Sequence, residues 1–198
     1  MKLILYTQRV EIVKEYGERR DCADQRIPSF LSVCGYCPVP VSNVPKLVIE
    51  IAEKLCPDGI FFTGGNSLTK FGGEAPERDR AERLLVEWAV SHGVPIFGIC
   101  RGMQFLADYF GGNIVPIEGH AGTRHAVTGV ISRKSVNSYH NFAMLELPKG
   151  LEALARAEDG TVEAFRHEDY PVMAVGWHPE REAPYLNSDI QMVQQVFG

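Results

Sequence analysis

Residues 94–110 read VPIFGICRGMQFLADYF and contain the clearest structural signal in the chain. A short apolar run comes first, then a Gly-x-Cys-x-Gly turn centred on Cys100, then a helix-like run. This order predicts strand, tight turn and helix, which is the form of a nucleophile elbow. Gly98 and Gly102 suit a strained turn because they lack a Cβ. We therefore expect Cys100 above a sheet edge at a helix N-terminus, where exposed N–H groups favour a thiolate.

The segments before this stretch alternate between strand and helix. Short apolar runs at residues 2–7 and 59–63 are typical of parallel strands that are buried on both faces. Residues 36–41 are expected to be extended, and their prolines indicate an edge position or a strand end. Helices are expected within residues 20–34, with a break near Pro28, and over residues 44–55 and 77–92.

After residue 112 the pattern changes to closely spaced short strands. These are expected at residues 128–133, 154–157, 161–166 and 172–177, followed by a closing helix at 187–197. Alternating strands and helices followed by mostly strands predict an α/β fold. Its sheet is expected to be mostly parallel, with helices on both faces and an antiparallel extension. The chain contains no repeat and no linker, so a single domain is expected over residues 1–198.

The charge balance argues against some partners. The chain has 198 residues with 20 basic and 25 acidic side chains, giving a formal net charge of −5. This balance disfavours binding to nucleic acid or to an anionic membrane. The first apolar run is too short for a signal peptide, and no run approaches the roughly 20 residues that span a bilayer. We therefore expect a cytoplasmic protein that does not bind membranes.

The cysteines indicate a reducing compartment. There are five of them, an odd number, which fits free thiols rather than a disulfide framework. Cys34 and Cys37 have the spacing of a redox motif, but they run into Pro38-Val39-Pro40 rather than into a helix. No second cysteine pair completes a zinc site. No metal and no organic cofactor are expected.

A thiol nucleophile needs a base, and His178 follows the apolar run 172–176. A histidine at a strand end faces the crevice at the carboxyl edge of the sheet, where open α/β sheets place their sites. Glu180 lies two residues further on and can fold back towards the imidazole, because Pro179 restricts the intervening backbone. The three side chains together predict a nucleophile, a base and an orienting carboxylate.

Residues 97–104, FGICRGMQ, and 176–180, GWHPE, resemble the two signatures of class I glutamine amidotransferase domains. The likeness extends from Gly59 to about Glu182. It implies a flavodoxin-like fold and a catalytic triad of Cys100, His178 and Glu180. In that family the cysteine attacks a γ-glutamyl amide and a γ-glutamyl thioester forms, which water then hydrolyses.

The same resemblance implies further site residues. The backbone N–H groups of Gly65 and Arg101 match the oxyanion hole. Gln104 matches a residue that contacts the glutamyl part of the substrate, and residues 137–140 resemble the loop that holds its amino acid head. The substrate contacts implied or left open in this way are Gly64, Asn66, Gln104, Ser138, Tyr139 and His140.

Several polar residues keep two interpretations. His140 is either a substrate contact or a structural histidine bonded to backbone. His120, Arg124 and His125 lie in or beside the glycine-rich loop 118–122, which is either solvated or leans over the crevice. The basic residues after the first strand are either a solvated face or a clamp for an anionic substrate group such as phosphate. They are Arg9, Lys14, Arg19 and Arg20.

The sequence leaves the identity of the departing amine open. Arg101 and Trp177 resemble the branch that hydrolyses γ-glutamyl-γ-aminobutyrate. The chain's length and its opening, residues 8–21, look more like bacterial γ-glutamyl-CDP-amidate hydrolases of capsule phosphoramidate synthesis, whose nucleotide substrate would give Arg9 and Arg19 a role. A third alternative is a glutaminase subunit that supplies ammonia to a synthetase partner. A non-catalytic module is disfavoured by the intact triad, and a homodimer is left open.

Overall fold

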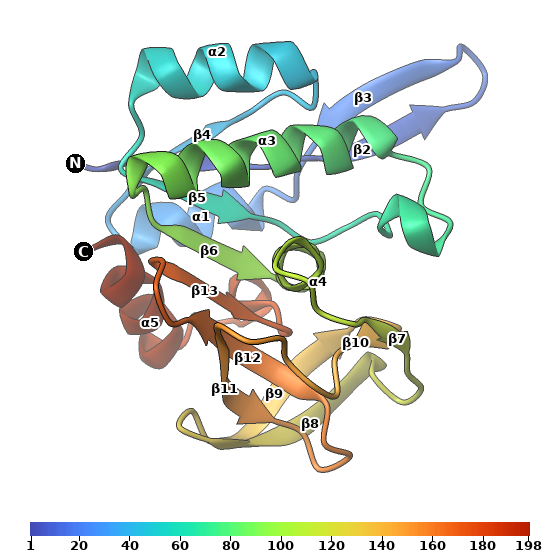
Figure 1. The fold of residues 1–198 in the computed structure, drawn as a ribbon, viewed down its shortest axis with the longest axis vertical. Coiled ribbons are helices and arrows are strands. Elements are labelled where there is room, and N and C mark those ends of the chain that lie inside the picture. The colour runs from blue at the N-terminus through green and yellow to red at the C-terminus, as the bar shows by residue number, and fades with distance from the viewer.

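The computed structural model describes residues 1–198 and centres on a nine-stranded sheet (Figure 1). Its strand order is β4-β1-β5-β6-β13-β12-β11-β8-β9. The first five strands in this order pair in parallel, and the last four continue the sheet with antiparallel pairing. This confirms the predicted mostly parallel sheet with an antiparallel extension. The parallel strands are β4 (Cys37–Pro40), β1 (Leu3–Tyr6), β5 (Gly59–Phe62), β6 (Ile96–Ile99) and β13 (Val172–Val175), and the antiparallel ones are β12 (Val162–His167), β11 (Leu151–Arg156), β8 (Ala121–Gly129) and β9 (Arg133–Tyr139).

Helices cover both faces of the sheet because neighbouring strand residues point to opposite sides. Ile60 and Phe62 belong to the core beneath α2 (Pro45–Leu55), α3 (Pro76–His92) and α4 (Arg101–Tyr109). Phe61 belongs to the opposite core, beneath α1 (Arg26–Val33) and α5 (Asn187–Phe197). The continuous apolar run of β5 is therefore explained by burial on both faces.

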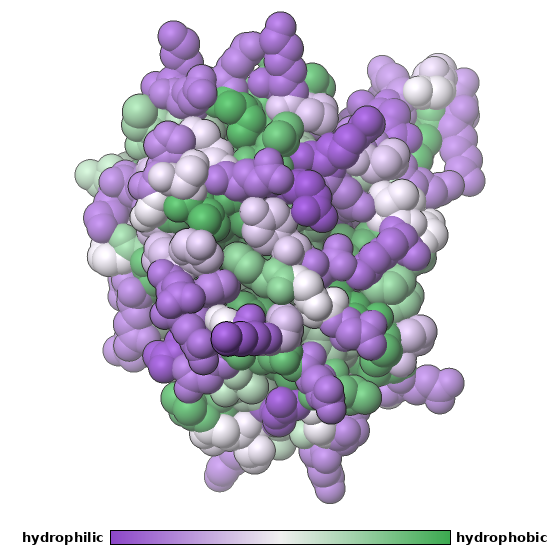
Figure 2. All heavy atoms as spheres, in the orientation of Figure 1, coloured by the Kyte–Doolittle hydropathy of each residue, from purple (hydrophilic) through white to green (hydrophobic).

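Short elements lie outside the main sheet. β2 (Arg9–Val13) and β3 (Glu18–Cys22) form a hairpin that projects from the body, and polar side chains cover most of it (Figures 1 and 2). β7 (Val115–Pro116) pairs with β10 (Phe142–Ala143). Two 3-10 turns, η1 (Thr69–Phe71) and η2 (Pro179–Arg181), complete the fold. None of the helices is both long and apolar enough to cross a bilayer.

Two local predictions are wrong. Residues 128–133 are not a strand: β8 ends at Gly129, which has φ +134°, and the Ser132 hydroxyl donates to the Gly129 carbonyl in the turn before β9. Pro28 does not break α1, because it is the third residue of the helix and needs no intrahelical N–H there. The closing helix at 187–197 is confirmed at both ends. All five cysteines are free, as expected.

The parallel register brings the proposed site together. Phe62 of β5 pairs with Gly98, and Val175 of β13 pairs with Ile99, so the carboxyl ends of three neighbouring strands lie side by side. Thr63 follows β5, Cys100 follows β6, and the segment leading to His178 follows β13. This edge of the sheet is where open α/β folds bind their ligands.

Candidate active site

Cys100 lies between β6 and α4 in a strained backbone conformation. Its φ of +49° and ψ of −110° are unusual for a residue with a side chain. The chain can turn this sharply because its neighbours are glycines: a Cβ on Gly102 would lie 2.3 Å from the carbonyl oxygen of Phe62, and one on Gly98 would lie 2.7 Å from Leu106. The Cys100 side chain is thereby held at the start of α4 with little solvent exposure.

His178 and Glu180 form a buried pair beside Cys100. Nδ1 of His178 lies 2.6 Å from Oε1 of Glu180. A Cβ placed on Gly64 would lie 2.8 Å from Cε1 of His178 and 3.6 Å from Cβ of Cys100, so both side chains face the same point. The contact with Glu180 occupies Nδ1 and leaves Nε2 available on the other side of the ring. This is the relative arrangement of nucleophile, base and orienting carboxylate in hydrolytic triads.

The protonation of His178 is set by opposing effects. Burial disfavours its charged form, but the negative charge of a Cys100 thiolate and the Glu180 carboxylate outweigh burial and raise the pKa of His178 to about 9. The imidazolium form of His178 is therefore favoured near neutral pH. It places a proton donor beside the Cys100 sulfur.

The loop after β5 faces the thiol. Gly65 has φ +79° and Asn66 has φ +55°, so the backbone turns sharply here. The Asn66 side chain bonds to both backbone polar groups of Val10, at 2.8 and 2.9 Å, which fastens the loop to hairpin strand β2. The amide of Asn66 is thus engaged by protein rather than free for a substrate. Arg9 packs over Gly65, since a Cβ there would lie 2.9 Å from the Arg9 side chain.

A buried charge network supports this loop from within. Arg78 of α3 donates to the carbonyl oxygens of Thr63 at 2.9 Å and Gly64 at 3.1 Å. Glu82 accepts from Arg78 at 2.9 Å and also pairs with the guanidinium of Arg101. Sequence reasoning missed this network, although Arg78 and Glu82 stand four residues apart on one helix.

A small cavity next to Cys100 is lined by Gln104, His140 and Gly176. The Gln104 amide is buried and donates to the carbonyl oxygen of Phe142 at 2.9 Å. Nδ1 of His140 lies 3.1 Å from the same carbonyl oxygen. His140 is therefore bonded to backbone, as a structural histidine would be, and it also lines the cavity, as a substrate contact would.

Residues 137–140 are largely strand rather than loop, since β9 extends to Tyr139. Ser138 is buried, whereas Tyr139 is half-exposed and places its ring edge-on to His178 with centroids 5.5 Å apart. Asn137 has a role that the sequence did not reveal. Its amide accepts from the His178 N–H at 2.8 Å and donates to the His178 carbonyl at 2.9 Å, so it clamps that backbone on both sides.

A larger polar groove of about 510 Å³ adjoins the loop. Arg9 and Lys14 line it together with Asn66 and Glu74. Arg9 also lines the narrow pocket that contains His178 and Glu180. Arg9 is therefore the cation that connects the groove to the proposed site.

Arg19 does not line either cavity. Its guanidinium pairs with Glu77 at 2.5 Å and donates to the Glu74 carbonyl at 2.7 Å. This places Arg19 behind the groove wall rather than inside the groove. Arg20 pairs with Glu18 on the exposed hairpin. His120 and His125 line none of the cavities at Cys100 and meet Glu163 instead.

Comparison with known proteins shows which family this chain belongs to. The family model for glutamine amidotransferase class-I matches residues 21–189. The γ-glutamyl-CDP-amidate hydrolase of Campylobacter jejuni is 31% identical over 197 residues, covering 97% of this chain and 96% of its own. The glutamine-hydrolyzing GMP synthase subunit of Thermococcus kodakarensis is 31% identical over 156 residues, with coverage of 73% and 78%.

The fold agrees with a solved structure. A glutamine amidotransferase from Thermotoga maritima superposes with a TM-score of 0.70 at 16% identity, covering 98% of this chain and 83% of its own. The family model matches most of the chain, and a relative is 31% identical over nearly its full length. This sequence similarity shows a shared family and not only a shared fold. The chain belongs to the class I glutamine amidotransferase family and is an amide-hydrolysing enzyme.

Proposed function

We propose that this chain hydrolyses a γ-glutamyl amide with Cys100 as nucleophile, His178 as general base and acid, and Glu180 as the group that orients His178. The observation that carries this proposal is the juxtaposition at the sheet edge. Cys100, at φ +49°, and His178 both lie beside Gly64. Nδ1 of His178 is also 2.6 Å from the buried carboxylate of Glu180. These are the groups that thioester chemistry requires.

The first step forms the thioester. The Cys100 sulfur attacks the carbonyl carbon of the γ-glutamyl amide, and the electron pair of the C=O bond moves to oxygen. When the tetrahedral intermediate collapses, the C–N bond breaks and protonated His178 donates its proton to the departing nitrogen. Glu180 stabilises the imidazolium until that proton is transferred.

The second step consumes water. Neutral His178 accepts a proton from a water molecule, whose oxygen attacks the thioester carbon. Collapse expels the Cys100 thiolate, so glutamate leaves and the imidazolium–thiolate pair is restored. In both steps the backbone N–H groups of Gly65 and Arg101 are the proposed donors to the oxyanion.

The groove supports a nucleotide-bearing amine as the leaving group. We infer that the substrate is γ-glutamyl-CDP-amidate, the compound named in the Campylobacter jejuni relative. Arg9 lies between the His178 pocket and a polar groove of about 510 Å³. A guanidinium in that position suits phosphate oxygens that follow the scissile nitrogen.

Two measurements test the proposal. Cys100→Ala should abolish turnover because no other group at the site can form the thioester, and mass spectrometry of the quenched wild-type enzyme should show a glutamyl adduct on Cys100. Steady-state kinetics should give a higher kcat/KM for γ-glutamyl-CDP-amidate than for glutamine or γ-glutamyl-γ-aminobutyrate. Turnover by Cys100→Ala would overturn the mechanism. Equal kcat/KM values would overturn the substrate assignment alone.

A second candidate is a glutaminase subunit that delivers ammonia to a synthetase partner. It is favoured by the similarity to the glutamine-hydrolyzing GMP synthase subunit from Thermococcus kodakarensis. In this case the purified chain should hydrolyse glutamine weakly and should be stimulated strongly by its partner. High activity of the isolated chain on a γ-glutamyl substrate would exclude this alternative.

A further inference from the structure

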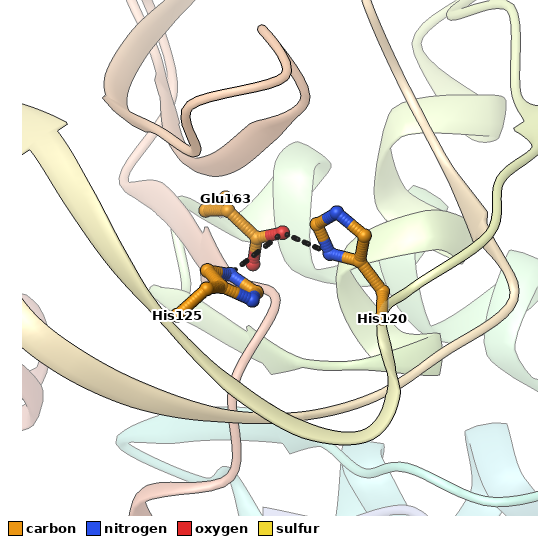
Figure 3. Close-up of side chains that lie close together, drawn as sticks. All are labelled: His120, His125 and Glu163. Carbon is orange, nitrogen blue, oxygen red and sulfur yellow. Dashed lines mark ion pairs between the residues drawn. The ribbon is translucent and has the colours of Figure 1, made fainter.

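Three histidines converge on one buried carboxylate beside the glutamyl cavity. Glu163 of β12 is fully buried. Its Oε1 lies 3.2 Å from Nδ1 of His120, 3.4 Å from Nε2 of His125 and 3.4 Å from Nε2 of His140. Figure 3 shows His120 and His125 directed at Glu163 from opposite sides. The cluster joins residues from three separate segments of the antiparallel extension.

None of these contacts is a hydrogen bond. Nδ1 of His120, the Nε2 atoms of His125 and His140, and both carboxylate oxygens of Glu163 are buried without a hydrogen-bond partner. Buried polar atoms in proteins are nearly always satisfied, so five unsatisfied ones in one place require a reason. These atoms lie at ion-pair distance from one another but make no hydrogen bond, so a cation between them would satisfy them together.

The spacing fits a small cation. Four ligands at about 2.0–2.1 Å from a tetrahedral Zn²⁺ lie about 3.3–3.4 Å apart along each edge. The separations from Glu163 Oε1 are 3.2 Å to Nδ1 of His120 and 3.4 Å to Nε2 of His125. The donor atoms of His120, His125 and Glu163 all lie within 4.8 Å of one another. Modest contraction would close the site around one ion.

The outer nitrogens are already held in the way that metal-binding histidines usually are. Nε2 of His120 lies 2.8 Å from a carboxylate oxygen of Asp159, and Nδ1 of His140 lies 3.1 Å from the carbonyl oxygen of Phe142. The contact with Asp159 fixes the ring of His120 and keeps its Nδ1 facing Glu163. Metal-ligating imidazoles characteristically donate their second N–H to a carboxylate or backbone carbonyl.

We propose that His120, His125 and Glu163 bind one zinc ion, with His140 packed beside the same carboxylate. Imidazole nitrogen and carboxylate oxygen suit Zn²⁺, and its charge would offset the buried Glu163 carboxylate. Glu163 is fully buried and His120 is nearly so, which suits a structural ion rather than one that meets a substrate. This inference revises the expectation of no metal, which was based on cysteine spacing and treated His120 and His125 as residues of a loop.

The zinc ion would connect the β8–β9 hairpin to the strand next to the active site. The Gly176 N–H donates to the Glu163 carbonyl at 2.7 Å, and a Cβ on Gly176 would lie 2.3 Å from a Glu163 carboxylate oxygen. Gly176 stands two residues before His178. The same hairpin carries Asn137, which clamps the His178 backbone. Binding at Glu163 is therefore coupled to the position of His178.

The test measures metal binding directly, without activity. Cys100→Ala protein removes the thiolate as a competing ligand, and we would strip it with chelator and titrate it with Co²⁺ alone and then with Zn²⁺. We expect one equivalent of Co²⁺ with the visible absorption of a tetrahedral ion, displaced by Zn²⁺, and a higher Tm for the zinc-loaded protein. Absence of a one-equivalent binding event at micromolar metal would overturn the proposal.

Variants locate the ion. Glu163→Gln and His120→Asn in the Cys100→Ala protein should lose the tetrahedral spectrum. Asp159→Asn, whose side chain is half-exposed, should fold normally and weaken zinc binding by about 10- to 100-fold, the usual effect of removing an outer partner. His92→Gln, at an exposed position on α3, is the matched control and should bind as tightly as its parent. Unchanged affinity in Asp159→Asn together with an unchanged spectrum in Glu163→Gln would overturn the assignment.

Discussion

Arg101 and Glu82 form a buried ion pair that joins the nucleophile turn to helix α3. Glu82 also holds Arg78, whose guanidinium donates to the Gly64 carbonyl. Because a trans peptide points its C=O and N–H in opposite directions, fixing the Gly64 carbonyl on Arg78 directs the Gly65 N–H away from Arg78. One network therefore braces both backbone segments that supply the proposed oxyanion donors.

Replacing Arg78 tests this support. Arg78→Lys keeps a positive charge but cannot bond several carbonyls at once. We expect kcat to fall by about 10²–10³, as when an oxyanion donor is lost, with a much smaller change in KM. Steady-state kinetics on the preferred γ-glutamyl substrate would measure the split. Arg80→Lys, on the exposed side of the same helix, is the control, and an equal loss in both variants would contradict the assignment.

The proposed roles of Glu180 and His178 can be distinguished by how much each substitution lowers the turnover rate. Glu180→Gln retains the base but loses the carboxylate 2.6 Å from Nδ1, so turnover should fall less than in His178→Ala, where the loss should be on the order of 10³ or more. Single-turnover kinetics would compare the two variants. A larger loss in Glu180→Gln than in His178→Ala would be incompatible with an orienting role.

The raised pKa of His178, about 9, predicts an alkaline limit to activity. The departing nitrogen needs a proton from His178, so kcat/KM should decline as pH rises through about 9. Removing the Glu180 carboxylate removes one cause of the raised pKa, so the limb should move to lower pH in Glu180→Gln. A pH–rate profile measures both. The charged or titratable groups that face His178 or line its pocket are Cys100, Glu180, Tyr139, Arg9, Arg181, Cys22 and Asp24.

The same shift has a consequence for stability. His178 binds its proton more tightly in the folded chain than in the unfolded one, so its contribution is complete below about pH 6.5 and is lost as pH rises through about 9. The free energy of unfolding should therefore decline across this window by up to about 1.4 kcal/mol per pH unit. His178→Gln should flatten that slope in denaturant titrations, and an unaltered slope would contradict the shift.

Arg9 should control affinity for an anionic leaving group. Arg9→Ala removes the cation shared by the groove and the His178 pocket, so KM for γ-glutamyl-CDP-amidate should rise by about tenfold or more, while glutamine turnover should change little. Arg19→Ala is the matched control, because that guanidinium is engaged by Glu77. Equal effects of the two substitutions on KM would argue against a phosphate contact at Arg9.

Asn137 should matter for stability as well as for rate. Asn137→Ala leaves the buried N–H of His178 without a partner, which costs about 1–3 kcal/mol, while the His178 carbonyl keeps the Arg181 N–H at 3.1 Å. Thermal or denaturant unfolding would measure the loss, and kcat should fall because His178 is less well fixed. Asn141→Ala, at an exposed position just after the strand, is the comparison, and a similar loss there would remove the special role of Asn137.

Local sequence patterns predicted the turn around Cys100 because its two glycines and its apolar flanks are adjacent in the chain. The pairing of His178 with Glu180 was predictable for the same reason, since they are two residues apart. The β2–β3 hairpin was not predicted, because the sequence of β3 is ERRDC and its polar residues show no apolar alternation. Strand periodicity is visible only where one face is buried.

Features that depend on distant segments stayed hidden. Arg78 and Glu82 look like an ordinary surface pair on an amphipathic helix, and only the packing of α3 against the loop after β5 reveals their contacts. The histidines near Glu163 come from separate strands and loops, with no spacing that a metal motif would show. In both cases the tertiary fold determines what each side chain meets.

The β2–β3 hairpin pairs with itself and with no strand of the main sheet. Its first residue, Arg9, lines the pocket that contains His178 and Glu180, whereas Cys100, His178 and Glu180 all stand on the sheet edge or directly after it. Substitutions and changes of length in the hairpin therefore leave the register of the parallel strands intact. Under the proposed function, a change of hairpin would alter which amine leaves, while the residues proposed for the thiol chemistry stay in place on the sheet edge.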